Sequence, residues 1–209
     1  MTTPTLIYVA DPMCSWCWGF SPVLEEIRQL YQSRVTFELM LGGLRPGNTE
    51  RFDESRRAYI LQHWHAVNER TGQPFDFEFQ MGPTFTYDTE PASRATVVIR
   101  QCAPGKEWEF LKRIQEAFYV QNADVTKAET LEGVAVALGM EASQFREAYH
   151  DQQTKQLLWE EFDQSRQLGV SGFPMLLGRN EQPVSVLMHG YQDIGALKVV
   201  IEQFLQKFP

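Results

Sequence analysis

Short apolar runs near the start of the chain have the length and residue types of β-strands. Leu6–Val9 is one such run, and Val35–Leu41 is a second in which every other residue is apolar. Between them, apolar residues from Phe20 to Tyr31 recur at helical spacing. This β-α-β order favours parallel pairing of the two strands through a helical crossover.

The middle of the chain shows helical periodicity and no convincing strand. We expect helices over residues 49–70, from Pro91 to about Ala103, over 106–121 and 126–139, near Ser143, and in a longer stretch that ends at Leu168–Gly169. Residues 73–89 hold several aromatic side chains at no regular spacing, which predicts a loop. The middle is therefore expected to be helix and loop throughout.

Strand patterns return towards the C-terminus. Two apolar runs, residues 173–177 and 184–188, are separated by the turn-forming segment 178–183, which predicts a hairpin. Asp193 is placed to cap a final helix. The order of elements predicts an α/β fold, a small sheet flanked by helices with a helical insertion. We expect residues 1–44 and 152–209 to form one discontinuous domain and residues 45–151 to form the insertion domain.

Composition narrows the class of protein. The chain has 209 residues, of which 43% are hydrophobic, and a net charge of −8, which argues against nucleic-acid binding. No run of 18 apolar residues predicts a membrane span, and the first apolar run stops at Asp11 without a basic segment before it. We therefore expect a cytoplasmic protein. Three cysteines are too few for a disulfide scaffold of this size.

Two of the cysteines lie at the turn between the first strand and the first helix, in the sequence Cys14-Ser15-Trp16-Cys17. Two intervening residues at a helix start bring the two sulfurs close enough to form a disulfide. The N–H groups and the dipole at the helix N-terminus favour a thiolate at the first position. The second cysteine is one turn further in, where it can resolve a mixed disulfide. The pattern therefore predicts that Cys14 attacks and Cys17 resolves.

Two other interpretations of the pair were weighed, a zinc half-site and two inert cysteines. Zinc needs about four ligands. The other candidate ligands form no second close pair that could face one metal: Cys102, His63, His65, His150 and His189. The sequence therefore predicts no metal site, and Cys102 is expected to be a small core residue of a helix.

A proline near the second strand region fits the redox interpretation. Phe173-Pro174 directly precedes the hairpin, where a proline can begin a strand. A cis bond there would make a tight bend beside the cysteines, and the peptide groups of Phe173 could then pair with an extended substrate. Phe173, Pro174 and Trp16 are therefore the candidate substrate-binding residues.

These features together resemble a thioredoxin fold with a helical insertion. The chain is similar over essentially its whole length to the DsbA-like thiol:disulfide oxidoreductases. It resembles in particular their cytosolic predicted protein-disulfide isomerase group, through the segment Asp11-Pro12-Met13-Cys14-Ser15-Trp16-Cys17-Trp18. The resemblance implies that the Phe173–Pro174 bond is cis. It also implies that Pro22 kinks the active-site helix.

The chain departs from the thioredoxin pattern at one position. Thioredoxins carry a buried acid in the strand before the cysteines, whereas Leu6–Val9 contains none. Asp11 is a candidate replacement that would carry the proton of Cys17. The alternative is that Asp11 only forms the turn before Pro12.

The leading functional hypothesis is a dithiol–disulfide oxidoreductase or isomerase. It would act on disulfide-containing proteins or small thiols, with glutathione or a thioredoxin-type system as redox partner and with no metal or organic cofactor. A second hypothesis is a glutathione-dependent enzyme like the kappa-type transferases and hydroxychromene-carboxylate isomerases. Those enzymes activate glutathione with a serine, so the presence of both Cys14 and Cys17 argues against it. A third is a non-catalytic chaperone or adaptor, which the fold alone does not exclude.

Overall fold

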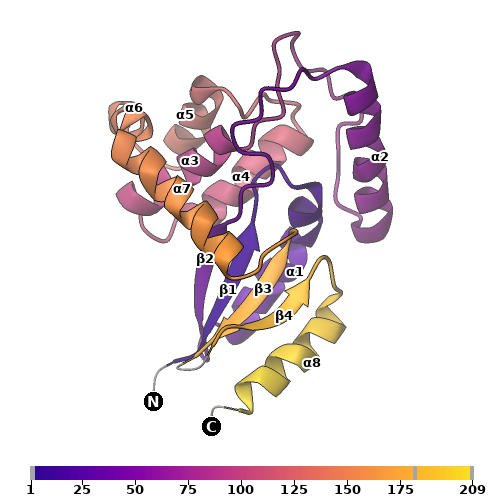
Figure 1. Ribbon diagram of the computed structural model, residues 1–209, viewed down its shortest axis with the longest axis vertical. Coiled ribbons are helices and arrows are strands. Elements are labelled where there is room, and N and C mark those ends of the chain that lie inside the picture. Colours follow the sequence, from indigo (N-terminus) through magenta and orange to yellow (C-terminus); the bar gives the residue numbers. More distant parts are fainter. Residues whose placement is uncertain (1–2, 181–182, 208–209) are drawn as a thin grey trace.

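The computed structural model describes residues 3–180 and 183–207 and contains a four-stranded sheet with helices packed around it (Figure 1). The elements in chain order are β1 (Thr5–Ala10), α1 (Ser15–Tyr31), β2 (Thr36–Leu41), α2 (Glu54–Thr71), α3 (Glu90–Cys102), α4 (Glu107–Tyr119), α5 (Ala128–Ala137), α6 (Ala142–His150), α7 (Gln152–Gln167), β3 (Met175–Arg179), β4 (Ser185–His189) and α8 (Ile194–Leu205). The predicted α/β architecture with a helical insertion is confirmed.

The strands lie in the order β2-β1-β3-β4. β1 and β2 are parallel, with Thr5 opposite Thr36 and Ala10 opposite Leu41, as the β-α-β pattern predicts. β3 runs antiparallel to both β1 and β4, which confirms the predicted hairpin. Two residues of its expected turn, 181 and 182, lie outside the described residues.

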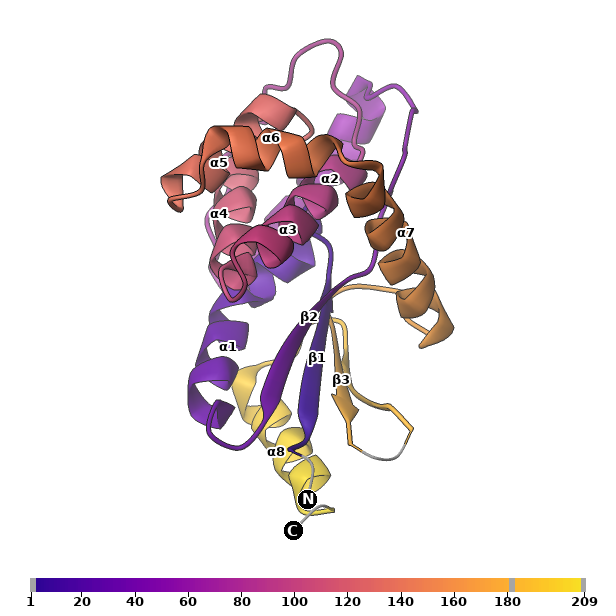
Figure 2. The same cartoon turned by 90° about the vertical axis from the view of Figure 1, so that its left-hand side faces the viewer.

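The central strand β1 is buried on both faces. Leu6 and Tyr8 point to the face covered by α1 and α8, where they join a core that includes Phe20, Leu24, Leu197 and Ile201. Ile7 and Val9 point to the opposite face and pack with Met175 and Leu177. In Figure 2, α1 and α7 lie on opposite sides of the sheet. Burial on two faces explains why β1 reads as a continuous apolar run.

A second hydrophobic core lies among the helices beyond the carboxyl ends of β1 and β2 (Figure 1). It is rich in aromatic side chains, among them Trp64, Phe110, Phe118 and Phe145. The segment 72–89 contains no helix or strand, as predicted, yet it buries Phe79, Phe85 and Tyr87 in this core. The division of the chain into two domains at residues 44/45 and 151/152 stays a prediction.

Three element boundaries differ from the sequence-based expectation. β3 begins at Met175, because its pairing with β1 starts there, and Phe173 lies outside the strand. α2 begins at Glu54, where the Asp53 carboxylate accepts a hydrogen bond from the backbone of Arg56. Asp193 precedes α8 as expected but makes no capping hydrogen bond. Its carboxylate instead forms an ion pair with Arg70 of α2.

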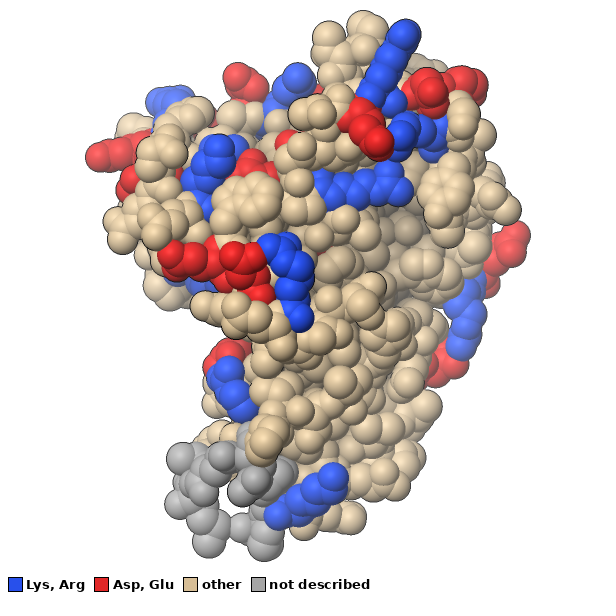
Figure 3. Space-filling model, in the orientation of Figure 1, with Lys and Arg blue, Asp and Glu red and all other residues tan. Residues whose placement is uncertain are grey.

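Charged side chains of both signs are interspersed over the helical part of the molecule, while few lie over β3 and β4 on the face in Figure 3. Oppositely charged neighbours form ion pairs, such as Arg94 with Glu90 inside α3. Within residues 3–180 and 183–207, no helix combines the length and apolar character required to cross a bilayer.

One partly buried carboxylate joins three elements below the site. Oε1 of Glu161 in α7 accepts a hydrogen bond from the backbone N–H of Leu41 at the end of β2, at 2.7 Å. Both carboxylate oxygens also bind the guanidinium of Arg100 in α3, at 2.9 and 3.1 Å. The side chain of Glu161 is only 12% exposed. Such paired, charge-assisted contacts fix geometry more strongly than a single hydrogen bond does.

We expect Glu161→Ala to lower the free energy of unfolding by about 2–3 kcal/mol, because Arg100 and the Leu41 N–H lose their acceptor. Urea unfolding followed by circular dichroism measures the change. The neighbouring Glu160 is exposed, so Glu160→Ala is the matched control and should stay within about 0.5 kcal/mol of wild type. Equal losses in the two variants would contradict the role given to Glu161.

Candidate active site

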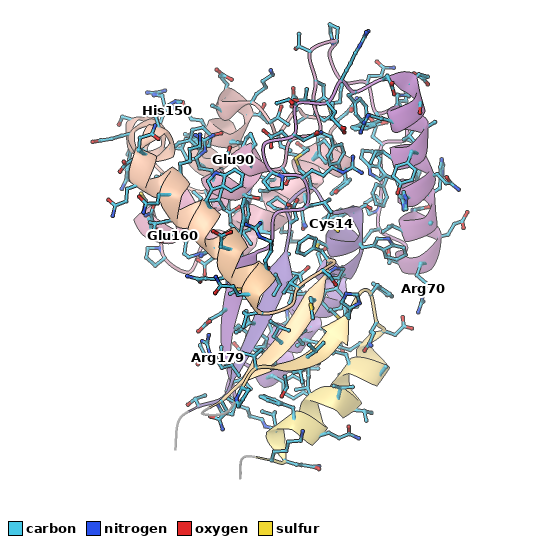
Figure 4. All side chains as sticks on the ribbon, in the orientation of Figure 1. Cys14, Arg70, Glu90, His150, Glu160 and Arg179 are labelled. Atoms are coloured by element: carbon cyan, nitrogen blue, oxygen red, sulfur yellow. The ribbon has the colours of Figure 1, made fainter. Side chains whose placement is uncertain are left out.

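The two cysteines of the motif form the first turn of α1. Cys14 is the residue that caps the helix, and its carbonyl accepts hydrogen bonds from the N–H groups of Cys17, at 3.0 Å, and Trp18, at 3.1 Å. Both cysteines are free thiols and their side chains are hydrogen-bonded neighbours. In Figure 4, Cys14 lies where the sheet meets the helical part of the molecule.

The two thiols have different environments. Cys14 is 6% exposed, whereas Cys17 is fully buried. Burial raises the pKa of Cys17 well above its ordinary value, and the contact with Cys14 raises it further. The backbone N–H of Asp11 and the hydroxyl of Tyr8 act in the opposite direction. The accessible thiol is therefore Cys14, and the thiol that holds its proton at neutral pH is Cys17.

The loop before β3 lies directly against Cys14. The Phe173–Pro174 peptide bond is cis, as the resemblance implied. The carbonyl oxygen of Phe173 lies 3.8 Å from Sγ of Cys14 and accepts a thiol hydrogen bond. The carbonyl of Pro174 accepts a hydrogen bond from Gly190 N at 2.9 Å, which joins this loop to the end of β4. The structure thus brings Phe173 and Pro174 to the cysteine pair.

A glycine at the end of β2 makes room for the Phe173 ring. A Cβ atom on Gly42 would lie 1.9 Å from Cε1 and 2.4 Å from Cζ of that ring. These separations are far below any real carbon–carbon contact, so a larger residue at position 42 would have to displace the ring. Gly42 therefore sets the position of the loop that touches Cys14.

A shallow cavity of about 280 Å³ lies beside the motif, lined by Trp16, Arg70, Phe173, Gly190 and Tyr191. The rings of Trp16 and Tyr191 are 6.0 Å apart, and the Arg70 guanidinium lies 5.0 Å from the centre of the Tyr191 ring. Trp16 is half-buried and faces this cavity, whereas Trp18 is buried in the helical core. The structure therefore places Trp16 and Phe173 on one surface.

Asp11 is fully buried, and its carboxylate connects two loops. Oδ1 accepts the N–H of Met13 at 2.8 Å, and Oδ2 accepts the N–H of Leu44 at 2.7 Å. Burial raises the pKa of Asp11 to about 6, against the opposing effect of these two hydrogen bonds. Asp11 contacts Cys17 through its backbone N–H. Its proposed role as a proton carrier stays a prediction.

The helical part of the chain supplies further neighbours that the sequence did not identify. The Tyr87 hydroxyl donates to the Met13 carbonyl at 2.6 Å, and the Trp18 indole N–H donates to the Pro74 carbonyl at 2.9 Å. Tyr8 of β1 lies behind Cys17. The alternation along β1 could have placed Tyr8 on the helix-covered face, but no pattern in the sequence connects residues 74 and 87 to the motif.

Cys102 and the histidines take no part in this arrangement. Cys102 is partly buried against the helical core, and burial raises its pKa. In the described part of the chain, no three His, Cys, Asp or Glu side chains gather in a way that could hold a metal ion.

The sequence profile of the DSBA-like thioredoxin domain family matches residues 5–202, so the chain belongs to this family. The fold with a helical insertion and the resemblance stated from the motif agree with this membership.

Among solved structures, a candidate protein disulfide isomerase from Nitrosomonas europaea is 40% identical over the whole of both chains, with a TM-score of 0.93. The cytosolic disulfide reductase DsbM from Pseudomonas aeruginosa is 25% identical, covers 97% of this chain and 99% of its own, and has a TM-score of 0.79. The ClpXP adapter protein SpxH of Halalkalibacterium halodurans is 24% identical over 85% of this chain. The chain spans about 60% of the length of that curated relative.

We expect Gly42→Ala to slow the reaction of Cys14 with a disulfide about tenfold or more, because the displaced Phe173 ring moves the loop that contacts the thiol. Stopped-flow reaction of the reduced protein with a chromogenic disulfide measures the rate. Gly133 has no neighbour within 4 Å of an added Cβ, so Gly133→Ala is the matched control and should react at the wild-type rate. Identical rates in the two variants would show that the Gly42 contact does not position the site.

The buried Asp11 carboxyl gives a defined pH dependence of stability. Its pKa is about 6 in the folded protein, above its ordinary value of 3.8, so its contribution is fully present below pH 3.8 and is lost as the pH rises through 6. Relative to Asp11→Asn, the wild type should lose about 3 kcal/mol of unfolding free energy between pH 4 and pH 7. Urea unfolding at a series of pH values checks this. Parallel curves for the two proteins would refute it.

Proposed function

We propose that the protein is a thiol:disulfide oxidoreductase in which Cys14 and Cys17 exchange a dithiol for a disulfide. The observation that carries the proposal is the asymmetry of the two neighbouring thiols at the start of α1. Cys14 is at the surface beside Phe173, and Cys17 is buried behind it. This is the arrangement that attack by one thiol and resolution by the other requires.

The proposed cycle has two exchanges. The Cys14 thiolate attacks a substrate disulfide, a mixed disulfide forms and the first substrate sulfur leaves as a thiolate. The Cys17 thiolate then attacks Sγ of Cys14, which forms the Cys14–Cys17 disulfide and releases the second substrate sulfur. The reverse sequence oxidises a substrate dithiol. Isomerase activity is the case in which a thiol of the substrate, in place of Cys17, releases the mixed disulfide.

We propose that the substrate contacts the surface made by Trp16, Phe173 and Pro174. This surface is continuous with the cavity that holds Arg70, whose cation suits a carboxylate-bearing thiol. A structure of the P. aeruginosa disulfide reductase is described with GSH, which supports glutathione as a redox partner of this chain. The same relative is described as cytosolic, which supports the cytoplasm as the site of action.

A second candidate function is that of an adaptor. The SpxH relatives from H. halodurans and Bacillus subtilis, 24% and 23% identical, are named as ClpXP adapters, and this observation favours it. An adaptor would use the same surface near Trp16 to bind a partner without exchanging its disulfides. A glutathione-dependent transferase or isomerase remains the other alternative, in which Ser15 rather than a cysteine pair would have to act.

The decisive experiment compares reduction of insulin disulfides by wild type, Cys14→Ser and Cys17→Ala, with glutathione as the reductant. We expect Cys14→Ser to lose the activity, because no other accessible thiol lies in the motif. Cys17→Ala should accumulate a mixed disulfide on Cys14 that mass spectrometry detects. Cys102→Ser changes the remaining cysteine and is the matched control, with activity equal to wild type.

The outcomes separate the alternatives. Glutathione-transfer activity that survives in both motif variants would favour the transferase, and absence of exchange by the wild type would favour the adaptor. Activity that depends on Cys102 would contradict the assignment of the motif.

A further inference from the structure

Tyr8 lies directly behind the resolving cysteine. It occupies the middle of β1, on the face covered by α1, and is 1% exposed. Its hydroxyl is hydrogen-bonded to the side chain of Cys17. Its ring packs between Phe20, 5.8 Å away, and Trp108, 6.4 Å away, so the hydroxyl is held at the sulfur. Tyr8 is thus the side chain of β1 that contacts a reacting atom.

A cavity of about 410 Å³ between α1 and α4 reaches the same two residues. Cys17 and Tyr8 line its inner end, and Glu25 and Lys112, each about half-exposed, line its outer end. Phe37 of β2 is also in the lining. Because β2 and β3 lie on opposite sides of β1, this cavity approaches Cys17 from the side away from the Phe173 loop.

The cavity is polar enough to hold water. Gln115 of α4 is 2% exposed and lines the cavity, and its Nε2 has no hydrogen-bond partner among the described protein atoms. Ser21 adds a hydroxyl to the lining. Buried donors of this kind are normally satisfied by ordered water, and the volume far exceeds that of one water molecule. A chain of water from Lys112 to Tyr8 therefore fits this cavity.

The proposed exchange gives such a path a purpose. Cys17 must lose its proton before its sulfur can attack Cys14, and the thiol is shut off from solvent on the substrate side. When the proton leaves, a negative charge remains in a buried site. A hydroxyl that donates a hydrogen bond to that sulfur stabilises the charge, and water in contact with the hydroxyl accepts the proton.

We propose that Tyr8 is a catalytic residue of the resolving step and that the cavity between α1 and α4 is the proton exit of Cys17. The Tyr8 hydroxyl donates to the Cys17 thiolate as it forms, and the thiol proton passes to cavity water and out to solvent. The thiolate then attacks Sγ of Cys14, the bond from Cys14 to the substrate breaks, and the substrate leaves as a thiolate. This inference rests on the proposed oxidoreductase function and deepens it.

Other charged or titratable groups near Cys17 are few. Cys14 is its neighbour on α1, and Tyr8 faces it from β1. Along the cavity, the charged side chains of α1 and α4 are Glu25, Arg28, Glu109 and Lys112. Lys112 is paired with Glu25, and Glu109 with Arg113. Arg28 lies over the Trp108 ring at 4.2 Å.

The test separates the two chemical steps in Tyr8→Phe, which keeps the ring and removes only the hydroxyl. Attack by Cys14 is timed in the Cys17→Ala background, and resolution is timed by rapid mixing from the mixed disulfide. We expect resolution to slow about tenfold, as a thiolate that loses one donor requires, and its pH midpoint to rise. Attack should change less than twofold. Gln115→Met should slow resolution without altering attack.

Tyr149 is another buried tyrosine, far along the chain in the helical core, so Tyr149→Phe is the control and should leave both steps unchanged. Thermal unfolding verifies that each variant is folded. Resolution by Tyr8→Phe at the wild-type rate and pH midpoint would overturn the role of Tyr8, and equal slowing of attack and resolution would reduce it to packing. If the wild type exchanges no disulfide at all, it is the proposed function that fails.

Discussion

The buried carboxylate of Asp11 holds the site together. It follows β1 directly, and its two oxygens bind the N–H of Met13, just before the cysteines, and the N–H of Leu44, just after β2. The carboxyl ends of two parallel strands are thereby tied to one anion, which fixes the start of α1 relative to Gly42 and its contact with Phe173. Burial without water makes each of these bonds costly to lose, so the turn has little freedom to move.

From that fixed turn, the two sides of α1 face different surroundings. One side meets the Phe173 loop, where Cys14 is accessible to another molecule. The other side meets Tyr8 and the cavity towards α4, where Cys17 is sealed from substrate but close to polar groups. Exchange chemistry needs this separation, because one sulfur has to meet a bulky disulfide while the other has only to release a proton. A helix that begins at the end of a central buried strand provides both environments within one turn.

Much of this could be predicted from the sequence, because it depends on local patterns. The apolar run of β1, the helical spacing after Cys17 and the turn residues before β4 each act over a few residues. The cis bond at Pro174 came only from the resemblance. The contacts that define the site escaped prediction because they join distant segments: Tyr87 to Met13, Phe173 to Gly42 and Asp193 to Arg70. The last of these even overrode a local preference, since Arg70 binds the carboxylate expected to cap α8.

The helical insertion is part of the site rather than an attachment to it. Met13 and Trp18 on either side of the motif are packed into the aromatic core of the helices, and Trp18 donates to the Pro74 carbonyl. Any movement of this core would therefore be transmitted to the first turn of α1. An adaptor would need only the surface near Trp16, whereas an oxidoreductase also needs the buried groups behind Cys17. The presence of Tyr8 at that sulfur, with a polar cavity beyond it, has a purpose only in the second case, and for this reason the interior of the protein favours catalysis over simple binding.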